Sequence, residues 1–399
     1  MRILVIGSGG REHAIAWRLK QSGHQVISTP GNPGMALIGD VIPTNDYLTI
    51  ARQNSVDLTV VGPEAPLVAG VVDQFRAAGL PIIGPTQANA RLEGSKVFAK
   101  QFMLDAGIPT ARSIQVTSQE DALKALEAFP LPVVIKADGL MAGKGVVIAN
   151  DLAEARQAVQ NLGPHLVIEE FLEGEEVSFI VLADGRQAVA FEATQDHKAV
   201  WDGDRGPNTG GMGAYCDGRI LDPATAKSVM ETVIQPVIDR TGFTGFLYAG
   251  LMLTVNGPKV LEFNVRLGDP ETQPLMHRLN SDFGEILNHA AHSDLAGIEM
   301  KWRLEPSVCV VLAAHGYPGQ VRTGDNITGI ENAETEVFQA GTRQGENGLE
   351  TSGGRVLGVT ARGTDLESSI HRAYEAVSAM HFDGMHFRKD IGGKGLKRW

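Results

Sequence analysis

Two lysines flank a glycine-rich connection between two short apolar runs, a combination that can hold a polyphosphate. Lys136 ends the first run, and Lys144 lies between Gly143 and Gly145 just before the second run, 146–148. The β-branched residues of both runs predict the two strands of a hairpin. Glycines let backbone N–H groups approach an anion closely, while the lysines neutralise phosphate charge. We therefore predict a polyphosphate clamp, with a solvated strand end and a flexible turn as the alternative.

A second polar set lies on one face of a predicted strand near the middle of the chain. The hairpin signal Asn256–Gly257 precedes this strand, and a period of two places Glu262, Asn264 and Arg266 on the same face. Carboxylate and amide oxygens suit a hard divalent cation, and a guanidinium suits an acidic group beyond it. We predict a magnesium site at Glu262 and Asn264, unless the three side chains simply face solvent.

An acidic segment, 169–176, follows the predicted strand 166–168. Carboxylates and backbone groups at such a strand end can accept the amino hydrogen of a purine and bind both hydroxyls of a ribose. The segment therefore predicts a purine nucleoside slot, with a solvated acidic turn as the alternative.

Neither of the two glycine-rich turns completes a standard nucleotide motif. Gly145 stands where a P-loop needs Ser or Thr, and Glu12 stands where a dinucleotide-binding turn needs its third glycine. No acidic residue ends the second predicted strand, 26–29, to bind a ribose. Because the N-terminal turn opens a helix whose first amides attract anions, we predict a sugar phosphate there. Its predicted ligands are Gly9, Gly10 and Arg11.

The elements that position these residues alternate between strand and helix. Strands at 3–6, 26–29, 56–61 and 81–84, with helical stretches such as 67–78 between them, predict a doubly wound parallel sheet. Further along, the pattern predicts a two-part core and a small α+β unit. The predicted class is a multidomain α/β and α+β protein, divided at 1–107 (substrate domain), 108–185 (lid), 186–302 (core) and 303–399 (C-terminal domain).

Composition narrows the functional classes. The chain has 399 residues, 43% of them hydrophobic, and a formal net charge of −12, so no broad basic face is available for nucleic acid or an anionic membrane. Two distant cysteines do not suggest disulfide bonds or a metal site, and no long apolar run suggests a membrane span. We expect a cytoplasmic enzyme.

In this order, these motifs resemble the ATP-grasp superfamily and, within it, the phosphoribosylamine–glycine ligase family. The resemblance extends over nearly the whole chain. The stretches that carry it are 7–12, 31–34, 62–67, 136–146, 196–198, 206–215, 262–273 and 388–392.

The resemblance implies roles for particular residues. The implied ATP-binding set is Lys96, Lys136, Gly143, Lys144, Gly145, Glu169, Glu170, Leu172 and Glu176, and the implied ligands of Mg²⁺ or Mn²⁺ are Glu262 and Asn264. The implied catalytic residues are Arg266, Lys136 and Lys144, and the substrate-binding set is Gly9, Gly10, Arg11, Asn32, Glu64, Asp196, Lys198, Gly268 and Asp269. Many ATP-grasp ligases have a further acidic metal ligand on the preceding strand, where this chain has Gly250.

The implied reaction joins glycine to 5-phosphoribosylamine and converts ATP to ADP and phosphate, as a step of purine biosynthesis. The expected protein is a monomer that makes at most a transient contact with the enzyme supplying phosphoribosylamine. Three alternatives stay open at this point: an ATP-grasp ligase with other substrates, a dinucleotide-dependent oxidoreductase suggested only by the N-terminal turn, and a nucleotide sensor without turnover.

Overall fold

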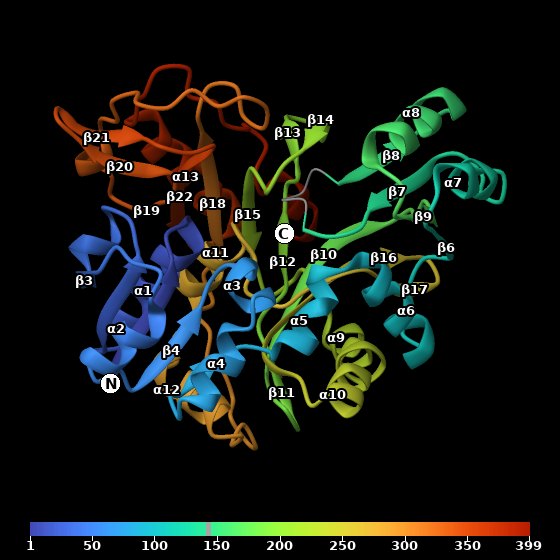
Figure 1. Ribbon diagram of the computed structural model, residues 1–399. Helices are drawn as coiled ribbons and strands as arrows, with labels where there is room; N and C mark the ends of the chain where they lie inside the picture. Colours follow the sequence, from blue (N-terminus) through green and yellow to red (C-terminus); the bar gives the residue numbers. More distant parts are fainter. Residues whose placement is uncertain (141–144) are drawn as a thin grey trace.

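Three main sheets organise the protein. The computed structural model describes residues 1–140 and 145–399, so the predicted ligands Gly143 and Lys144 lie outside the described residues. A parallel sheet forms the N-terminal part, a small antiparallel sheet lies apart from it, and one long sheet runs between the central and C-terminal parts (Figure 1).

The N-terminal sheet is the predicted doubly wound one, since its five strands are all parallel in the order β3-β2-β1-β4-β5. The predicted helix 67–78 is instead two short helices, because Gly70 adopts φ +84° between them. The strands are β1 (Arg2–Gly7), β2 (Gln25–Pro30), β3 (Asp40–Val41), β4 (Leu58–Val61) and β5 (Ile82–Ile83). The helices are α1 (Gly10–Gln21), α2 (Tyr47–Gln53), α3 (Glu64–Val68), α4 (Val71–Ala77), α5 (Gln87–Gly94) and α6 (Lys96–Ala106), with a 3₁₀ turn at Met35–Leu37.

The small sheet has four antiparallel strands in the order β6-β9-β7-β8, and it includes the predicted glycine hairpin as β7 and β8. Its apolar face packs on two amphipathic helices through residues such as Val133, Ile135, Ala155 and Ile168. Its elements are β6 (Ser113–Val116), β7 (Val133–Ala137), β8 (Val146–Ala149), β9 (Leu166–Glu170), α7 (Gln119–Leu126) and α8 (Leu152–Leu162). We call this unit the lid sheet.

The long sheet joins the central and C-terminal parts, because β15 pairs with β18. The predicted lid range 108–185 includes β10, which pairs with β16 in this long sheet, so the lid sheet itself ends at Glu170. The strands on the main path are β17 (Gly257–Asn264), β16 (Thr244–Thr254), β10 (Glu175–Asp184), β12 (Thr194–Asp196), β15 (Gly213–Cys216), β18 (Ser307–Ala313), β22 (Arg355–Arg362) and β19 (Glu336–Gln339).

The remaining elements cover this sheet or project from it. Strand β11 (Ala188–Ala190) pairs beside β10, and two small ribbons are formed by β13 (Ala199–Trp201) with β14 (Arg205–Asn208) and by β20 (Thr342–Gly345) with β21 (Gly348–Thr351). The helices are α9 (Pro223–Val229), α10 (Gln235–Thr241), α11 (Thr272–Arg278), α12 (Phe283–Ala291) and α13 (Leu366–Ser378), with a π turn at Met230–Ile234 and 3₁₀ turns at Ile330–Asn332 and Gly393–Arg398.

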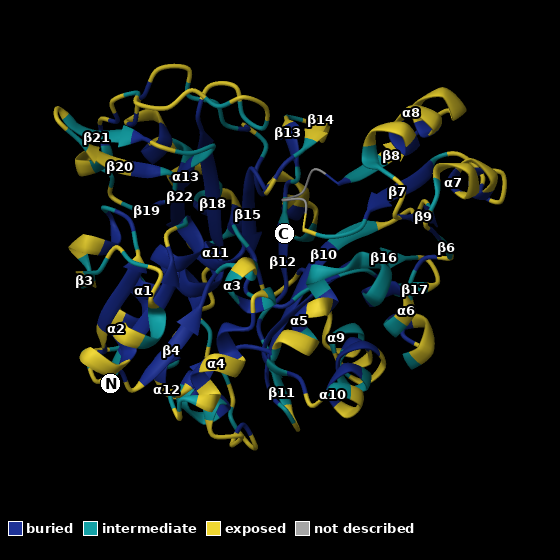
Figure 2. Ribbon diagram, viewed as in Figure 1, coloured by how far each residue is buried: buried dark blue, intermediate teal, exposed yellow. Residues whose placement is uncertain are grey.

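Burial follows the sheets. The strands of the N-terminal and long sheets are mostly buried, whereas the outer surfaces of α7 and α8 are exposed (Figure 2). Within the described ranges, none of the helices combines the length and the apolar character that crossing a membrane requires.

Candidate active site

The lid sheet meets the long sheet at Lys136. Val134 pairs with Glu169 across β7 and β9, so the period of two places Lys136 and Glu169 on the same face of the lid sheet. The Nζ atom of Lys136 lies 2.8 Å from Oε2 of Glu169 and donates a hydrogen bond of 2.9 Å to the carbonyl of Leu261 on β17. The lid amine therefore reaches the core strand one residue before Glu262.

Lys96 brings a second cation to the same place from the first turn of α6. Its Nζ donates to the carbonyl of Gly139 at 2.8 Å. Burial lowers the pKa of Lys96, while the nearby carboxylate of Glu262 opposes the shift and Lys136 adds to it. These electrostatic couplings place the two lysines and Glu262 around one region.

The predicted metal ligands lie together on β17. The Nδ2 atom of Asn264 lies 3.5 Å from Oε1 of Glu262, and position 250 on β16, directly opposite Glu262, is a glycine. No group of three His, Cys, Asp or Glu side chains forms a metal cluster among the residues outside 141–144. Two oxygen-bearing side chains still fit magnesium, which commonly keeps several waters and binds one or two protein groups together with substrate phosphates.

Arg266 extends this polar face toward the N-terminal domain. Its guanidinium lies 2.8 Å from Oε1 of Glu93 on α5 and 3.3 Å from Oε2 of Glu64 on α3, and it donates to Oδ1 of Asn264 at 3.2 Å. Burial opposes its charge, but Glu93 and Glu64 outweigh that effect and raise the pKa of Arg266. Sequence reasoning found Glu64 and missed Glu93, which lies inside an unremarkable helix.

A second ion cluster lies next to the first. Lys198 lies 2.8 Å from Oε1 of Glu176 and 2.9 Å from Oδ2 of Asp196. Burial opposes the charge of Lys198, but Asp196 and Glu176 raise its pKa well above the ordinary value. Thus the structure brings the predicted ribose ligand Glu176 together with the predicted substrate ligands Asp196 and Lys198.

Other polar residues near this second cluster were not predicted. The hydroxyl of Ser178 lies 2.7 Å from that of Tyr248 and donates to Oε1 of Glu271 at 3.2 Å. Burial raises the pKa of Glu271, and the charge of Asp196 adds to the shift. A period of two places Tyr248 on the same side of β16 as Gly250, a signal that could have identified it.

The N-terminal glycine turn faces the segment after β17. The amide of Gly9 donates to Oε2 of Glu12 at 2.6 Å, and a Cβ atom at Gly10 would lie only 2.8 Å from Nε2 of Gln273. Arg11 donates to the carbonyl of Leu267 at 3.1 Å. The backbone of the turn therefore lies close to the core, as a small-ligand cradle requires.

Gly268 and Asp269 also lie at this turn. The Oδ2 atom of Asp269 would be 3.6 Å from a Cβ at Gly9, and it forms an ion pair of 3.0 Å with Arg355 on β22. Burial opposes ionisation of Asp269, but Arg355 and Arg11 outweigh it and lower the pKa of Asp269. Arg355, which sequence reasoning missed, brings the C-terminal part to the same place.

Two further predicted substrate ligands, Asn32 and Glu64, differ in the protein groups that they contact. Both amide hydrogens of Asn32 are donated at 2.8 Å, to the carbonyls of Ser8 and Gln339, and its oxygen accepts from the amide of Met35 at 2.9 Å. Its amide thus joins the N-terminal turn to β19. Glu64, by contrast, contacts the active-site residue Arg266.

The remaining predicted nucleotide ligands lie at or next to the ends of strands β8 and β9 of the lid sheet. The carbonyl of Gly145 accepts from the amide of Ala137 at 2.8 Å. Glu170 accepts from the amide of Arg112 at 2.9 Å and lies 3.2 Å from Lys259 of β17. Leu172 is buried, as expected of a residue that packs against a base.

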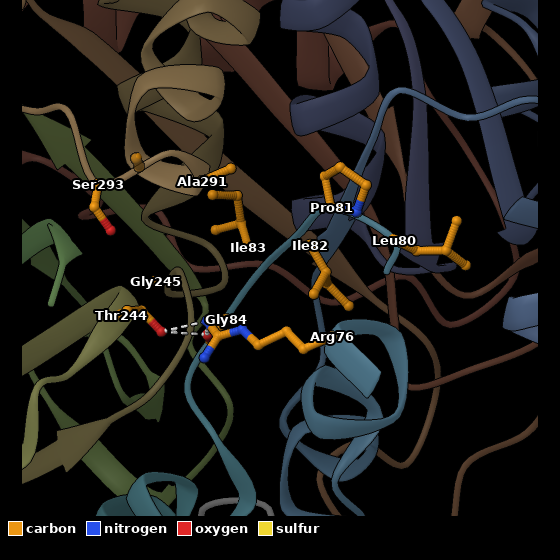
Figure 3. A pocket seen from close by; sticks show the side chains of 11 residues that line it. Arg76, Leu80, Pro81, Ile82, Ile83, Gly84, Thr244, Gly245, Ala291 and Ser293 are labelled. Carbon is orange, nitrogen blue, oxygen red and sulfur yellow. Dashed lines mark hydrogen bonds between the residues drawn. The ribbon is translucent and has the colours of Figure 1, made fainter. Parts of the chain in front are cut away.

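A separate cavity of about 330 Å³ lies where β5 and α4 meet the start of β16 and the end of α12. Figure 3 shows Arg76 extending toward Thr244, where it donates to the hydroxyl of Thr244 at 2.7 Å and to the carbonyl of Gly84 at 3.2 Å. Thr244 is six residues from Gly250 along β16, roughly 20 Å in an extended strand. The cavity is therefore distinct from the lysine–carboxylate region.

Comparison with known proteins agrees with this architecture. Three family profiles match consecutive parts of the chain: the N domain of phosphoribosylglycinamide synthetase over residues 1–93, its ATP-grasp (A) domain over 94–272 and its C domain over 307–394. Phosphoribosylamine–glycine ligases of Allochromatium vinosum and Vibrio cholerae are 48% and 46% identical, in each case over 100% of this chain and 99% of the relative.

Solved structures point the same way. The crystal structure of phosphoribosylamine–glycine ligase from Thermotoga maritima matches with a TM-score of 0.87 and 35% identity, over 98% of this chain and 100% of that one. N5-carboxyaminoimidazole ribonucleotide synthetase from the same organism, at 19% identity and a TM-score of 0.67 over 96% and 99% of the two chains, shares the fold.

The two antiparallel sheets that converge on Lys136 and Glu262 are thus those of an ATP-grasp enzyme. More narrowly, the chain belongs to the phosphoribosylglycinamide synthetase family of ligases.

Proposed function

We propose that this protein ligates glycine to 5-phosphoribosylamine, converting ATP to ADP and phosphate and giving glycinamide ribonucleotide. Its relatives of 45–48% identity over their whole length carry the name of that ligase. The observation that carries the proposal is the contact between Lys136 of the lid sheet and Leu261 of β17, beside Glu262. This contact joins cationic amines and oxygen ligands at one place, as phosphoryl transfer to a carboxylate requires.

The first chemical step places a glycine carboxylate oxygen on the γ-phosphorus of ATP, forming glycyl phosphate and releasing ADP. Two anions must meet in this step. At ~4 Å and an effective dielectric of about 20, one pair of unit charges interacts by about 4 kcal/mol. Lys96 and Lys136 offset this repulsion, and Glu262 and Asn264 would hold Mg²⁺ or Mn²⁺, which would supply further positive charge.

Arg266 orients the glycine carboxylate in this proposal. Its contacts with Glu93, Glu64 and Asn264 fix the guanidinium beside the metal ligands. Its Nη1 group donates to the carbonyl of Leu267 at 3.4 Å and has a second hydrogen that can be donated to a carboxylate.

In the second step the amine of phosphoribosylamine attacks the carbonyl carbon of glycyl phosphate, and phosphate leaves. The phosphate of phosphoribosylamine is held at the turn formed by Gly9, Gly10 and Arg11, where helix α1 begins. Glycyl phosphate hydrolyses readily, so the lid sheet also excludes water while the intermediate exists.

We propose further that Glu169, Glu170, Leu172 and Glu176 bind the nucleoside of ATP, and that Asn32, Glu64, Asp196, Lys198, Gly268 and Asp269 form the substrate sites. The divisions at 107 and 302 remain our proposed domain boundaries, whereas for the lid, predicted to extend to 185, we propose a boundary after Glu170, where the lid sheet ends. A cytoplasmic location, a monomeric state and a transient contact with the supplier of phosphoribosylamine remain predictions.

Substrate omission tests the proposal. The protein is incubated with ATP, magnesium, glycine and freshly prepared phosphoribosylamine, and ADP and the ribonucleotide product are both measured. We expect ADP formation to depend on glycine and product formation to need all three substrates. ADP release that is indifferent to glycine would exclude this ligase, and activity with another amine alone would indicate a different ATP-grasp reaction.

A further inference from the structure

Lys100 of α6 is a buried lysine that contacts Lys136 only through a shared carboxylate. The residue is 2% exposed, and its Nζ lies 2.8 Å from Oε1 of Glu169. The other oxygen of Glu169, Oε2, lies 2.8 Å from Nζ of Lys136. One carboxylate, itself 2% exposed, therefore bridges two ammonium groups.

The hydrogen bonds of the two lysines differ. Lys100 donates to the hydroxyl of Thr110 at 2.7 Å and lies 3.4 Å from the carbonyl of Ala111, so Glu169 and these two groups account for its three hydrogens. Within residues 1–140 and 145–399, Lys136 contacts Glu169 and the carbonyl of Leu261, and these two contacts leave one N–H for a ligand. Lys100 therefore directs its hydrogens to groups of the protein.

The net charge of this group depends on whether Lys100 is included. Lys136 and Glu169 together are neutral, whereas Lys100, Glu169 and Lys136 together carry one positive charge. A neutral pair would attract phosphate weakly, while a trio with one net positive charge keeps the attraction in a partly buried region where charges are poorly screened.

The other contacts of Lys100 lead to the same core strand. The hydroxyl of Thr110 donates to the carbonyl of Val260 at 2.7 Å, and the amide of Val260 donates to the carbonyl of Pro109 at 2.8 Å. Val260 and Leu261 immediately precede Glu262. Lys100 therefore connects the carboxylate that holds Lys136 to the strand that carries the metal ligands.

We propose that Lys100 is a positioning residue of the phosphate site: it offsets the charge of Glu169, so that Lys136 keeps a net positive charge and one N–H for the nucleotide phosphates. This inference rests on the proposed use of ATP. It assigns no contact between Lys100 and any substrate.

A double-mutant cycle tests whether charge compensation is the reason for Lys100. Calorimetry measures MgADP binding to the unmodified chain and to its Lys100→Met, Glu169→Gln and doubly substituted variants. We expect Lys100→Met to weaken binding at least tenfold when Glu169 is present, because the remaining pair is neutral. In the Glu169→Gln background the same substitution should weaken binding less than threefold, because Lys136 is then no longer neutralised. Equal losses in both backgrounds would overturn the proposal.

Two controls separate this role from general stability. Lys124→Met removes the same charge from an exposed helix position, where Lys124 forms an ion pair with Glu120, and should leave MgADP binding unchanged. Lys100→Arg keeps the charge and should bind MgADP within threefold of the unmodified chain. A folded Lys100→Arg variant with a tenfold loss would overturn the proposal even if Lys100→Met fails to fold.

Steady-state kinetics provide a measurement that would not change selectively if Lys100 had a purely structural role. The KM for ATP should rise in Lys100→Met while the KM for glycine stays within twofold. The outcomes also separate the proposed function from this inference, because MgADP binding can be measured without the ligation reaction. Failure of the unmodified chain to bind MgADP would overturn both the proposed function and this inference, whereas equal losses in the cycle would overturn only the inference.

Discussion

Lys136 joins the lid sheet to the long sheet through the carbonyl of Leu261, so its replacement tests the proposed phosphate site most locally. We predict that Lys136→Met lowers the rate of ADP formation more than tenfold, because one unit charge close to the transferred phosphoryl group is lost. Glu169 keeps its contact with Lys100, so the fold should survive. Thermal unfolding checks the fold, and Lys124→Met is the matched control. A Lys136→Met variant with full activity would contradict the assignment.

Arg11 tests the second substrate site. We predict that Arg11→Ala raises the KM for phosphoribosylamine at least tenfold and leaves the KM values for ATP and glycine nearly unchanged, since a charge-assisted hydrogen bond to the sugar phosphate is lost. Initial rates at varied phosphoribosylamine check this. Arg52, an exposed residue of α2, provides the control substitution. Unaltered kinetics in Arg11→Ala would favour a different acceptor.

At the residue scale, sequence periodicity placed the polar face of β17 correctly. It could not reveal partners that only the tertiary fold brings together. Glu93 and Lys100 lie in helices whose sequences look ordinary, and their functions depend on contacts with Arg266 and Glu169 from distant segments. For Lys100, the available sequence signal was its position four residues after Lys96 in a predicted helix, because residues at this spacing are neighbours on the helix surface.

Among the elements, Asn32 links the N-terminal turn to β19 through two hydrogen bonds to backbone carbonyls. Because Asn32 saturates its amide with three backbone groups, we predict that Asn32→Ala lowers the free energy of unfolding by about 1–3 kcal/mol, leaving buried backbone groups unpaired. Urea unfolding measures this, with the exposed Asn161 as the matched control site. If Asn32→Ala keeps its stability but has a raised KM for one of the substrates, Asn32 mainly binds that substrate instead.

Sequence patterns predicted best those helices and strands that are long or are bordered by strong turn signals. The lid hairpin and the β16–β17 hairpin turning at Asn256–Gly257 both occur in the structure. Strand β3, by contrast, has only two residues, too few for any periodicity, and it exists because β2 offers it a parallel partner. The break at Gly70 depends on a backbone conformation that apolar spacing does not encode.

For the whole molecule, buried histidines set a pH dependence of stability. Burial lowers the pKa of His13 and of His197 to about 4 and that of His277 to about 3, from an ordinary value of 6.5. The unfolded chain therefore binds more protons than the native one below about pH 6.5, and stability falls as the pH decreases from there toward 3. Denaturant midpoints measured across this range check the prediction.

Substitution of His277 can isolate the contribution of one histidine to this pH dependence, because its ring contacts Ser307 at 3.0 Å, which is not one of the proposed catalytic residues. His277→Gln should make the decline in stability between pH 6.5 and pH 3 shallower. An unchanged slope would show that other groups are responsible.

The three parts of the chain meet at one region of the whole molecule. Arg11 from the N-terminal domain, Asp269 from the core and Arg355 from the C-terminal strands are linked by charge around the glycine turn. The lid sheet approaches the same core from β17. This arrangement fits the two successive reactions that we propose, since glycine activation and amine attack would need separate substrates at adjacent positions.

Oxygen transfer tests carboxylate activation most directly. Glycine labelled with ¹⁸O in its carboxylate is converted with ATP and phosphoribosylamine, and the released phosphate is analysed by mass spectrometry. The proposed glycyl phosphate predicts one ¹⁸O atom in each phosphate released, because the attacking carboxylate oxygen leaves with the phosphoryl group. Unlabelled phosphate formed together with glycinamide ribonucleotide would contradict the account.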